Sequence, residues 1–187
     1  MMLNEAPPMH TLSAEEARLV FSEIYRSMPP GPESVSSEDV NIAVKGGEIR
    51  ARVLTPQGTA QSVMVYYHGG GWVVGNIDYY DLVGRHLAEK CNAIVVMVDY
   101  RKSPEHKYPV PMQDCYAALQ WVEANRQKIG AEKLPLIVAG DSAGGNLSAV
   151  MAQKTVAENG PKIDLQLLVY PVTDGRMQSE SFTAEDK

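Results

Sequence analysis

The stretch Gly140-Asp141-Ser142-Ala143-Gly144-Gly145 lies between an apolar segment, residues 134–139, and a helical pattern, residues 146–157. It carries G-x-S-x-G at a strand-to-helix junction, where a sharp turn lifts a serine hydroxyl out of a sheet. The backbone of such a turn is strained, and a Cβ at Gly140 or Gly144 would meet the neighbouring strand or helix. The free N–H groups of the following helix favour negative charge beside the serine. The stretch therefore predicts a nucleophilic Ser142, and the alternative is a glycine-rich turn with a capping serine.

Four apolar segments alternate with helical patterns along the chain. The apolar segments are Ser62–Tyr67, Ala93–Val98, Leu134–Ala139 and Leu165–Val169, and the helical patterns are Tyr80–Lys90, Gln113–Ile129 and Asn146–Ala157. Strands buried on both faces form continuous apolar runs, and their alternation with helices is typical of a parallel sheet covered on both faces. Val40–Val44 and Ile49–Leu54 alternate apolar and polar residues, which predicts an antiparallel hairpin at the edge. The predicted fold class is α/β with a mostly parallel sheet.

The first 36 residues are predicted to form a segment ahead of the main domain. Ser13-Ala14-Glu15-Glu16 is a capping box, and it opens a helix that extends to about Met28. Pro29-Pro30-Gly31-Pro32 ends this helix, because proline cannot continue it. We therefore expect an N-terminal helix and linker over residues 1–36 and the main domain over residues 37–187.

The composition is ordinary for a globular domain and argues against several classes of function. The chain has 187 residues, 44% of them hydrophobic, and its net charge of −6 disfavours nucleic acid or an anionic membrane as a partner. Its longest apolar run is too short to span a bilayer, and the N-terminus lacks a secretory pattern, so a cytoplasmic location is expected. Cys91 and Cys115 are too few and too widely spaced for a zinc site. We expect two free thiols that face the core, and no metal.

Three segments follow predicted strands at their carboxyl ends, where open α/β sheets bind ligands. They are Ser142, the run His68-Gly69-Gly70-Gly71 and the segment Tyr100–His106. Consecutive glycines let main-chain N–H groups approach a carbonyl oxygen that gains negative charge during acyl transfer. A flexible loop or a phosphate cradle is the alternative, but the chain has neither G-x-G-x-x-G nor G-x-x-x-x-G-K-[ST]. The glycine run and the serine turn together favour acyl transfer.

Four motifs occur in one order along the chain: His68-Gly69-Gly70-Gly71-Trp72, Asp99-Tyr100-Arg101 with Pro104-Glu105-His106, Gly140–Asn146, and Tyr170-Pro171-Val172-Thr173-Asp174. With them the chain closely resembles the hormone-sensitive-lipase-like family of α/β-hydrolases, the bacterial carboxylesterases in particular. The resemblance extends over essentially the whole chain, including the N-terminal helix, which in that family forms part of a cap. It implies hydrolysis of carboxylic esters, usually with short acyl chains, without a cofactor or metal.

The resemblance also implies roles for individual residues. Ser142 would be the nucleophile, and the backbone N–H groups of Gly70, Gly71 and Ala143 would form the oxyanion hole. The physical argument agrees, because such donors must come from the residue after the nucleophile and from the glycine loop. Ser142 would attack the carbonyl carbon of a small ester and form an acyl-enzyme, which water then cleaves.

The chain departs from the family where a catalytic triad should be completed. In this fold the serine is followed by the acid and then by the histidine. All four histidines, which are His10, His68, His86 and His106, precede Ser142. The family continues through further cap helices and two more strands. We therefore interpret the chain as the nucleophile half of an esterase, truncated, nicked or split within the second part of the cap. A C-terminal polypeptide would then supply the acid and the base.

Other polar residues near the predicted loops are interpreted as structural. We expect the supporting loop His68-Gly69 to be held by bonds from the histidine ring to its backbone. Asp141 is expected to fix the loop as a carboxylate rather than to act in a triad. Arg101 and Glu105 are predicted to form a buried or half-buried ion pair, and Asp114 to stabilise the dipole of its helix.

Two other functions stay open at this point. A chain without a base would suit a non-catalytic relative that binds small molecules, since the plant gibberellin receptors resemble this family, keep the serine turn and lack catalysis. The second open possibility is an inactive fragment with no function of its own. In this chain alone, Leu165–Val169 would be an exposed apolar edge strand, unless a second chain or a homo-oligomer covers it.

Overall fold

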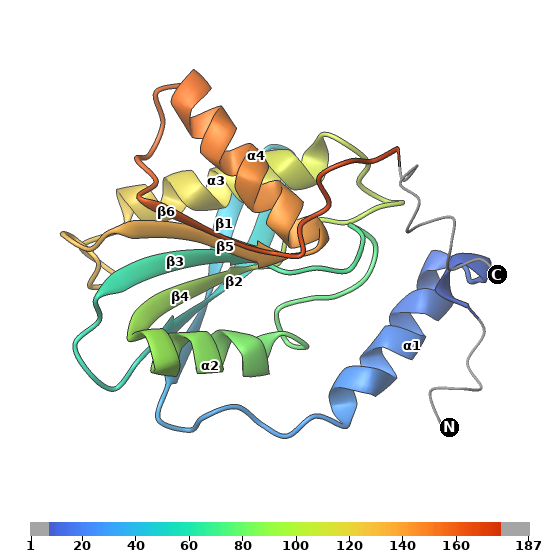
Figure 1. The fold of residues 1–187 in the computed structure, drawn as a ribbon, viewed down its shortest axis with the longest axis horizontal. Coiled ribbons are helices and arrows are strands. Elements are labelled where there is room, and N and C mark those ends of the chain that lie inside the picture. The colour runs from blue at the N-terminus through green and yellow to red at the C-terminus, as the bar shows by residue number, and fades with distance from the viewer. Residues whose placement is uncertain (1–7, 177–187) are drawn as a thin grey trace.

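The computed structural model describes residues 8–176, and its central feature is one six-stranded sheet (Figure 1). The strands lie side by side in the order β1-β2-β4-β3-β5-β6. Their bounds are Ser36–Val44 (β1), Gly47–Thr55 (β2), Ser62–Tyr67 (β3), Ala93–Val98 (β4), Leu136–Asp141 (β5) and Leu165–Val169 (β6). The strand β3, which precedes the glycine run, therefore lies between β4, which precedes residues 100–106, and β5, which precedes Ser142.

Strands β3 to β6 form the parallel part of the sheet. Every residue of β3 and β4 is buried, because helices cover both faces of these strands. Tyr67 at the end of β3 lies opposite Val98 of β4 and Gly140 of β5. The register thus brings the carboxyl ends of these three strands to one edge of the sheet. The predicted α/β fold with a mostly parallel sheet is confirmed.

The predicted antiparallel hairpin is also confirmed. Strands β1 and β2 pair from Ser36 opposite Thr55 to Val44 opposite Gly47, and β2 pairs antiparallel with β4. Both strands extend beyond the predicted bounds, because their exposed ends carry polar residues that hide the apolar alternation. Gly46 in the turn has a φ of 81°, a conformation that suits glycine in a two-residue hairpin turn.

Three helices cover the two faces of the sheet (Figure 1). The helix α2, Asp81–Cys91, lies on one face, and α3, Val110–Ala124, and α4, Ala143–Ala157, lie on the other. Side chains of β3 alternate between the two cores, because successive residues of a strand point to opposite faces. Val65 and Tyr67 belong to the core under α3 and α4, and Met64 and Tyr66 belong to the core under α2.

The bounds of α3 differ from the prediction at both ends. The helix begins at Val110 rather than Gln113, because Pro111 is tolerated in the first turn, where its missing N–H is not needed. It ends at Ala124 rather than Ile129. There the Asn125 backbone N–H bonds the carbonyl groups of the last turn, and its side-chain amide donates to Trp121 O over 2.8 Å.

The N-terminal helix α1, Ala14–Arg26, lies away from the sheet, near the loops that follow its strands (Figure 1). Its capping box forms as predicted, since Ser13 N donates to Glu16 Oε2 over 2.8 Å and Glu16 N donates to Ser13 Oγ over 3.3 Å. A short 3₁₀ helix, Met9–Thr11, precedes α1. Expectations for residues 1–7 and 177–187 lie outside the described residues.

The prediction for the two cysteines is half wrong. Both are free thiols, and Cys115 is buried in α3 as expected, but Cys91 is exposed at the last residue of α2. The buried residues of α2 are instead Gly84 and Ala88, which lie one turn apart and face the sheet. Among the helices within residues 8–176, none is long and apolar enough to cross a membrane.

The strand β6 forms the exposed edge of the sheet beside β5. Its apolar residues are open to solvent in this chain, with exposed fractions of 56% for Leu165, 39% for Leu167 and 38% for Val169. The predicted apolar edge is therefore confirmed. Such an edge offers unpaired backbone groups and an apolar surface to another strand.

Replacing Leu167 by lysine should lower self-association of the chain of residues 1–187, because a charge on an edge strand opposes edge-to-edge pairing. Sedimentation velocity over a range of concentrations measures the effect. Leu19→Lys is the control, since Leu19 is an exposed apolar residue of α1 rather than of the sheet. A parent chain that stays monomeric at every concentration would contradict the prediction.

Candidate functional site

Ser142 occupies a strained turn between β5 and α4. Its φ of 53° and ψ of −116° lie outside the regions that residues with a Cβ prefer. Three backbone bonds hold it there: Ser142 N donates to Val169 O over 2.9 Å, and Ser142 O accepts from Asn146 N and Val172 N over 3.0 and 3.2 Å. The Ser142 hydroxyl makes no capping hydrogen bond to α4, and the residue is half-buried. The backbone is therefore fixed, while the hydroxyl is not engaged by the helix that follows it.

Glycine is required where the turn approaches the end of β3. A Cβ on Gly140 would lie 2.5 Å from Tyr67 O, and a Cβ on Gly144 would lie 2.7 Å from His68 O and still closer to Tyr67 O. These are backbone atoms in a buried strand and the residue after it, so they cannot give way as a flexible side chain would. The two glycines thus let the start of α4 lie directly against the first residue of the glycine loop.

The glycine loop folds back on itself directly after β3. Gly70 and Gly71 have φ values of 115° and 60°, and the Gly70 carbonyl accepts from Val73 N over 3.0 Å and Val74 N over 2.9 Å. Within residues 8–176, the N–H groups of Gly70, Gly71 and Ala143 donate no hydrogen bond to the protein. Three backbone donors are therefore available at the end of the sheet where Ser142 lies.

His68 is buried at the start of this loop, with 1% of its surface exposed. Its Nδ1–H donates to Gly69 O over 2.7 Å, and its ring stacks on Tyr100 at 4.4 Å between centroids. Burial lowers the pKa of His68 to about 3, and the Lys102 charge acts in the same direction. The ring is therefore neutral at physiological pH and holds loop backbone rather than the Ser142 hydroxyl.

Asp141, the residue before Ser142, is buried and links the turn to the loop. Its carboxylate accepts from Tyr66 Oη over 2.7 Å, Tyr80 Oη over 3.1 Å and Gly69 N over 3.0 Å. Burial, with the Asp141 charge as the next cause, raises the pKa of both tyrosines, so they remain protonated donors. The carboxylate thus has its hydrogen bonds filled by structural partners.

The expected Arg101–Glu105 ion pair is wrong. Arg101 instead pairs with Asp114, which is fully buried, through Nε at 2.9 Å and Nη2 at 2.7 Å. The Asp114 carboxylate therefore balances the charge of the Arg101 guanidinium group and does not serve the dipole of α3 as expected. Glu105 pairs with Arg18 of α1 through two bonds of 2.7 Å. Sequence reasoning did not single out Arg18, because nothing in the pattern of α1 distinguishes a side chain that crosses to a loop so far along the chain.

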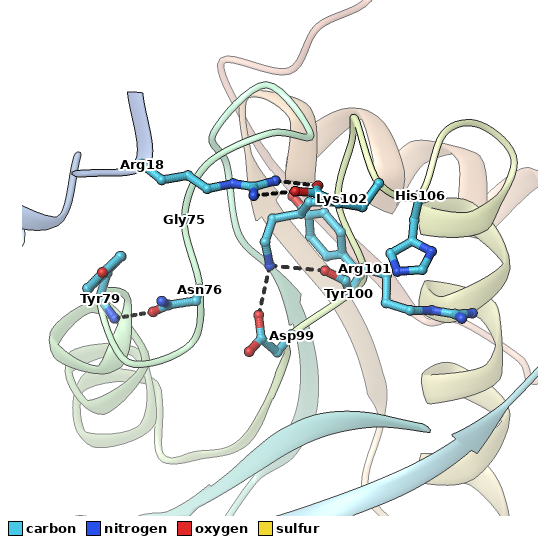
Figure 2. Close-up of a pocket in the computed structure, with 10 residues that line it drawn as sticks. Arg18, Gly75, Asn76, Tyr79, Asp99, Tyr100, Arg101, Lys102 and His106 are labelled. Carbon is cyan, nitrogen blue, oxygen red and sulfur yellow. Dashed lines mark hydrogen bonds and ion pairs between the residues drawn. The ribbon is translucent and has the colours of Figure 1, made fainter. Parts of the chain in front are cut away.

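Two cavities lie beside these loops. One, of about 460 Å³, is mostly apolar and is lined by Gly71, Trp72, Val73, Ser103, Tyr108, Pro111, Met112, Asn146, Leu147 and Val150. The other, of about 530 Å³, is lined mostly by polar and charged residues, and we call it the polar cavity (Figure 2). Its charges are paired, with Lys102 Nζ 3.0 Å from Asp99 Oδ1 and 3.1 Å from Tyr100 O. Of these two cavities, the apolar one touches both the glycine loop and α4.

No histidine completes a triad in the part of the chain that the structure describes. No hydrogen bond links the Ser142 hydroxyl to His10, His68, His86 or His106. His86 is exposed on α2, and His106 lines the polar cavity of Figure 2. The described residues therefore place the serine turn against the first residue of the glycine loop, but they supply no general base.

Comparison with known proteins identifies relatives of the same architecture. Residues 64–187 match the profile of a family described by its alpha/beta hydrolase fold. Carboxylesterase NlhH of Mycobacterium tuberculosis is 51% identical over 121 residues, 65% of this chain and 38% of that protein. Esterase LipI of the same species is 39% identical over 87% of this chain and 52% of its own. A solved thermostable esterase from Pseudomonas putida, 33% identical, has a TM-score of 0.90 over 98% of this chain and 58% of its own. The chain spans about half the length of the curated relatives it matches.

Replacing Gly144 by alanine should lower the free energy of unfolding by about 3 kcal/mol or more, because the new Cβ would meet backbone of β3 and the glycine loop. Gly175→Ala is the matched control, since nothing lies within 4 Å of a Cβ at that position. Urea unfolding followed by circular dichroism measures both variants. Equal stability of the two would contradict the close approach of α4 to β3.

The low pKa of His68 predicts that stability falls in acid. An unfolded chain protonates this ring near pH 6.5, whereas the folded chain does so only near about pH 3. As the pH falls through that window, the unfolded state binds a proton that the folded state does not. The free energy of unfolding should then decrease by about 1.4 kcal/mol per pH unit from this group.

Urea unfolding between about pH 7 and about pH 4 measures this slope for the parent chain, His68→Gln and His86→Gln. The His68 variant should lose the contribution, while the variant at exposed His86 should keep it. The same slope in all three proteins would show that His68 does not stay neutral in the folded state.

Proposed function

Because the chain belongs to the α/β-hydrolase family, we propose that it is the nucleophile-bearing part of a serine carboxylesterase. One observation carries this proposal. A strained and backbone-fixed Ser142 leaves its hydroxyl free of the helix, near a glycine loop and at a helix start where the N–H groups of Gly70, Gly71 and Ala143 have no partner within residues 8–176. Relatives named carboxylesterase and esterase support the same activity.

In the proposed reaction, the Ser142 oxygen attacks the carbonyl carbon of the ester while a general base removes the hydroxyl proton. The carbonyl oxygen gains negative charge in the tetrahedral intermediate. The N–H groups of Gly70, Gly71 and Ala143 stabilise that charge, because they are oriented before the reaction and need no reorganisation. The intermediate collapses to an acyl-enzyme and releases the alcohol, and water then cleaves the acyl bond.

The acid and the base of the triad would come from polypeptide C-terminal to this chain. The relatives are about twice as long as the stretch they share with it, and their fold places the acid and the histidine after the serine. The same polypeptide would pair with the exposed edge of β6. It would also complete a cap that begins with α1, so residues 1–36 serve as the first cap segment and residues 37–187 as part of the core.

We propose an ester with a short apolar acyl chain as the substrate. The apolar cavity of about 460 Å³ joins the glycine loop at Gly71 and Trp72 to Leu147 and Val150 of α4. Apolar walls of this kind bind hydrocarbon by removing it from water and give little affinity for a charged group. The net charge of −6 favours a small-molecule partner over nucleic acid. We also propose a cytoplasmic location.

Labelling and turnover test the function in the natural, full-length protein. A fluorophosphonate probe should label Ser142, and a short p-nitrophenyl ester should be hydrolysed. Ser142→Ala should abolish labelling and lower kcat by at least about 10³-fold, because the nucleophile is lost while binding and the oxyanion donors remain. Mass spectrometry of the labelled peptide locates the adduct.

Ser36→Ala is the control, since Ser36 is an exposed serine of β1 remote from the turn. It should keep both labelling and turnover. A full-length protein that gives neither would refute the esterase function and would leave the non-catalytic, ligand-binding relative as the better description.

A further inference from the structure

We propose that α1 fixes the glycine loop from both ends, and that Arg18 is a positioning residue for the oxyanion hole. This inference rests on the proposed esterase function and adds a role for the N-terminal helix. It concerns a side chain that touches neither Ser142 nor the glycines themselves. Arg18 acts through the carbonyl groups of Val73 and Ser103, which belong to two neighbouring loops.

Arg18 extends from α1 to two backbone carbonyl groups on separate loops. Its Nε donates to Val73 O over 2.9 Å, and its Nη2 donates to Ser103 O over 2.8 Å. The side chain is about one-third exposed, with an exposed fraction of 34%, so these bonds lie at the margin of solvent. Figure 2 shows Arg18 crossing from α1 towards the loop that carries Lys102 and His106. One guanidinium group therefore ties together three segments of the chain.

Glu105 holds that guanidinium group in the required orientation. Two parallel bonds of 2.7 Å join the carboxylate to Nη1 and Nη2 of Arg18, and the Arg18 hydrogen bond lowers the pKa of Glu105 to about 2. Glu105 is more than half exposed, so the ion pair alone contributes little to stability. The ion pair instead fixes the orientation of the planar guanidinium group. Its remaining N–H groups then point in fixed directions.

The carbonyl groups that Arg18 binds belong to the glycine loop and its neighbour. Val73 N and Val74 N both donate to Gly70 O, so Val73 closes the turn that contains Gly70 and Gly71. Ser103 N donates to Trp72 O over 2.8 Å, which joins the two loops directly. Arg18 completes this contact from the α1 side. The C-terminal end of the glycine loop is therefore fixed by bonds from outside it.

The other end of the loop is also connected to α1. Tyr25 of α1 stacks on Tyr79 at 5.7 Å and on Tyr80 at 5.5 Å between ring centroids. The Tyr80 hydroxyl donates to Asp141, which in turn accepts the Gly69 N–H. The helix thus reaches the loop at Val73 through Arg18 and approaches it at Gly69 through the aromatic stack. Displacing α1 would loosen the segment between these two points.

Donors of an oxyanion hole stabilise charge only when they are held at the position where that charge develops. A loop freed at one end would sample other positions, and small displacements at a reacting centre cost up to about 100-fold in rate. Substrate binding in the apolar cavity does not depend on these donors to the same degree. Loss of the Arg18 contacts should therefore lower kcat and leave KM nearly unchanged.

The test compares Arg18→Ala, Arg18→Lys and Arg26→Ala in the natural, full-length protein. Arg26 is the matched control, because it lies on the same helix and its one ion pair within residues 8–176 is with Glu23, three residues away. Arg18→Ala should lower kcat for a short p-nitrophenyl ester by about tenfold to about 100-fold. Arg18→Lys, which keeps the charge but lacks the planar fork of donors, should recover part of the loss, and Arg26→Ala should stay within about twofold.

Hydrogen exchange supplies a readout that is independent of turnover. The amides of Val73 and Val74 should exchange faster in Arg18→Ala than in Arg26→Ala, while amides of β3 exchange equally in both. If Arg18→Ala does not fold, Arg18→Lys carries the same comparison with a smaller expected loss. The inference is overturned if the parent is active and the folded Arg18 variants match Arg26→Ala in kcat. An inert parent would instead overturn the esterase function.

Discussion

The contact between the first turn of α4 and the end of β3 is the constraint on which the site depends. Gly144 lies against the carbonyl groups of Tyr67 and His68, and Gly140 lies against that of Tyr67. A side chain at either position would separate the helix from the strand. Because the approach is so close, the start of α4 meets the first residue of the glycine loop. Ser142 is thereby held in a conformation that only the surrounding backbone stabilises.

Polar side chains then fix the glycine loop in the place that this backbone contact defines. Asp141 accepts the Gly69 N–H, and Arg18 donates to the Val73 carbonyl group. Each of these bonds replaces water on a group that is wholly or partly buried, where an unmade hydrogen bond would be costly. The loop is therefore held by contacts with β5 and α1 rather than by its own sequence, which is rich in glycine.

The apolar runs predicted the sheet correctly because burial on both faces leaves no polar position in a strand such as β4. The ends of helices were harder to predict. The first turn of α3 contains Pro111, which in a sequence resembles a loop residue but is tolerated at a helix start. The Arg101–Glu105 pair was wrong because closeness in sequence favoured a local partner, whereas Asp114 and Arg18 bring the opposite charges from helices.

The sequence by itself determined the order of the elements, the serine turn and the glycine loop, because each depends on a local backbone requirement that a short pattern records. Only the tertiary structure decided which side chains hold these pieces together. Tyr66 and Asp141 are 75 positions apart, and Arg18 and Glu105 are 87 positions apart. They meet because parallel strands end at one edge of the sheet and α1 lies near that edge. No local pattern encodes such a meeting, since it depends on how distant elements pack.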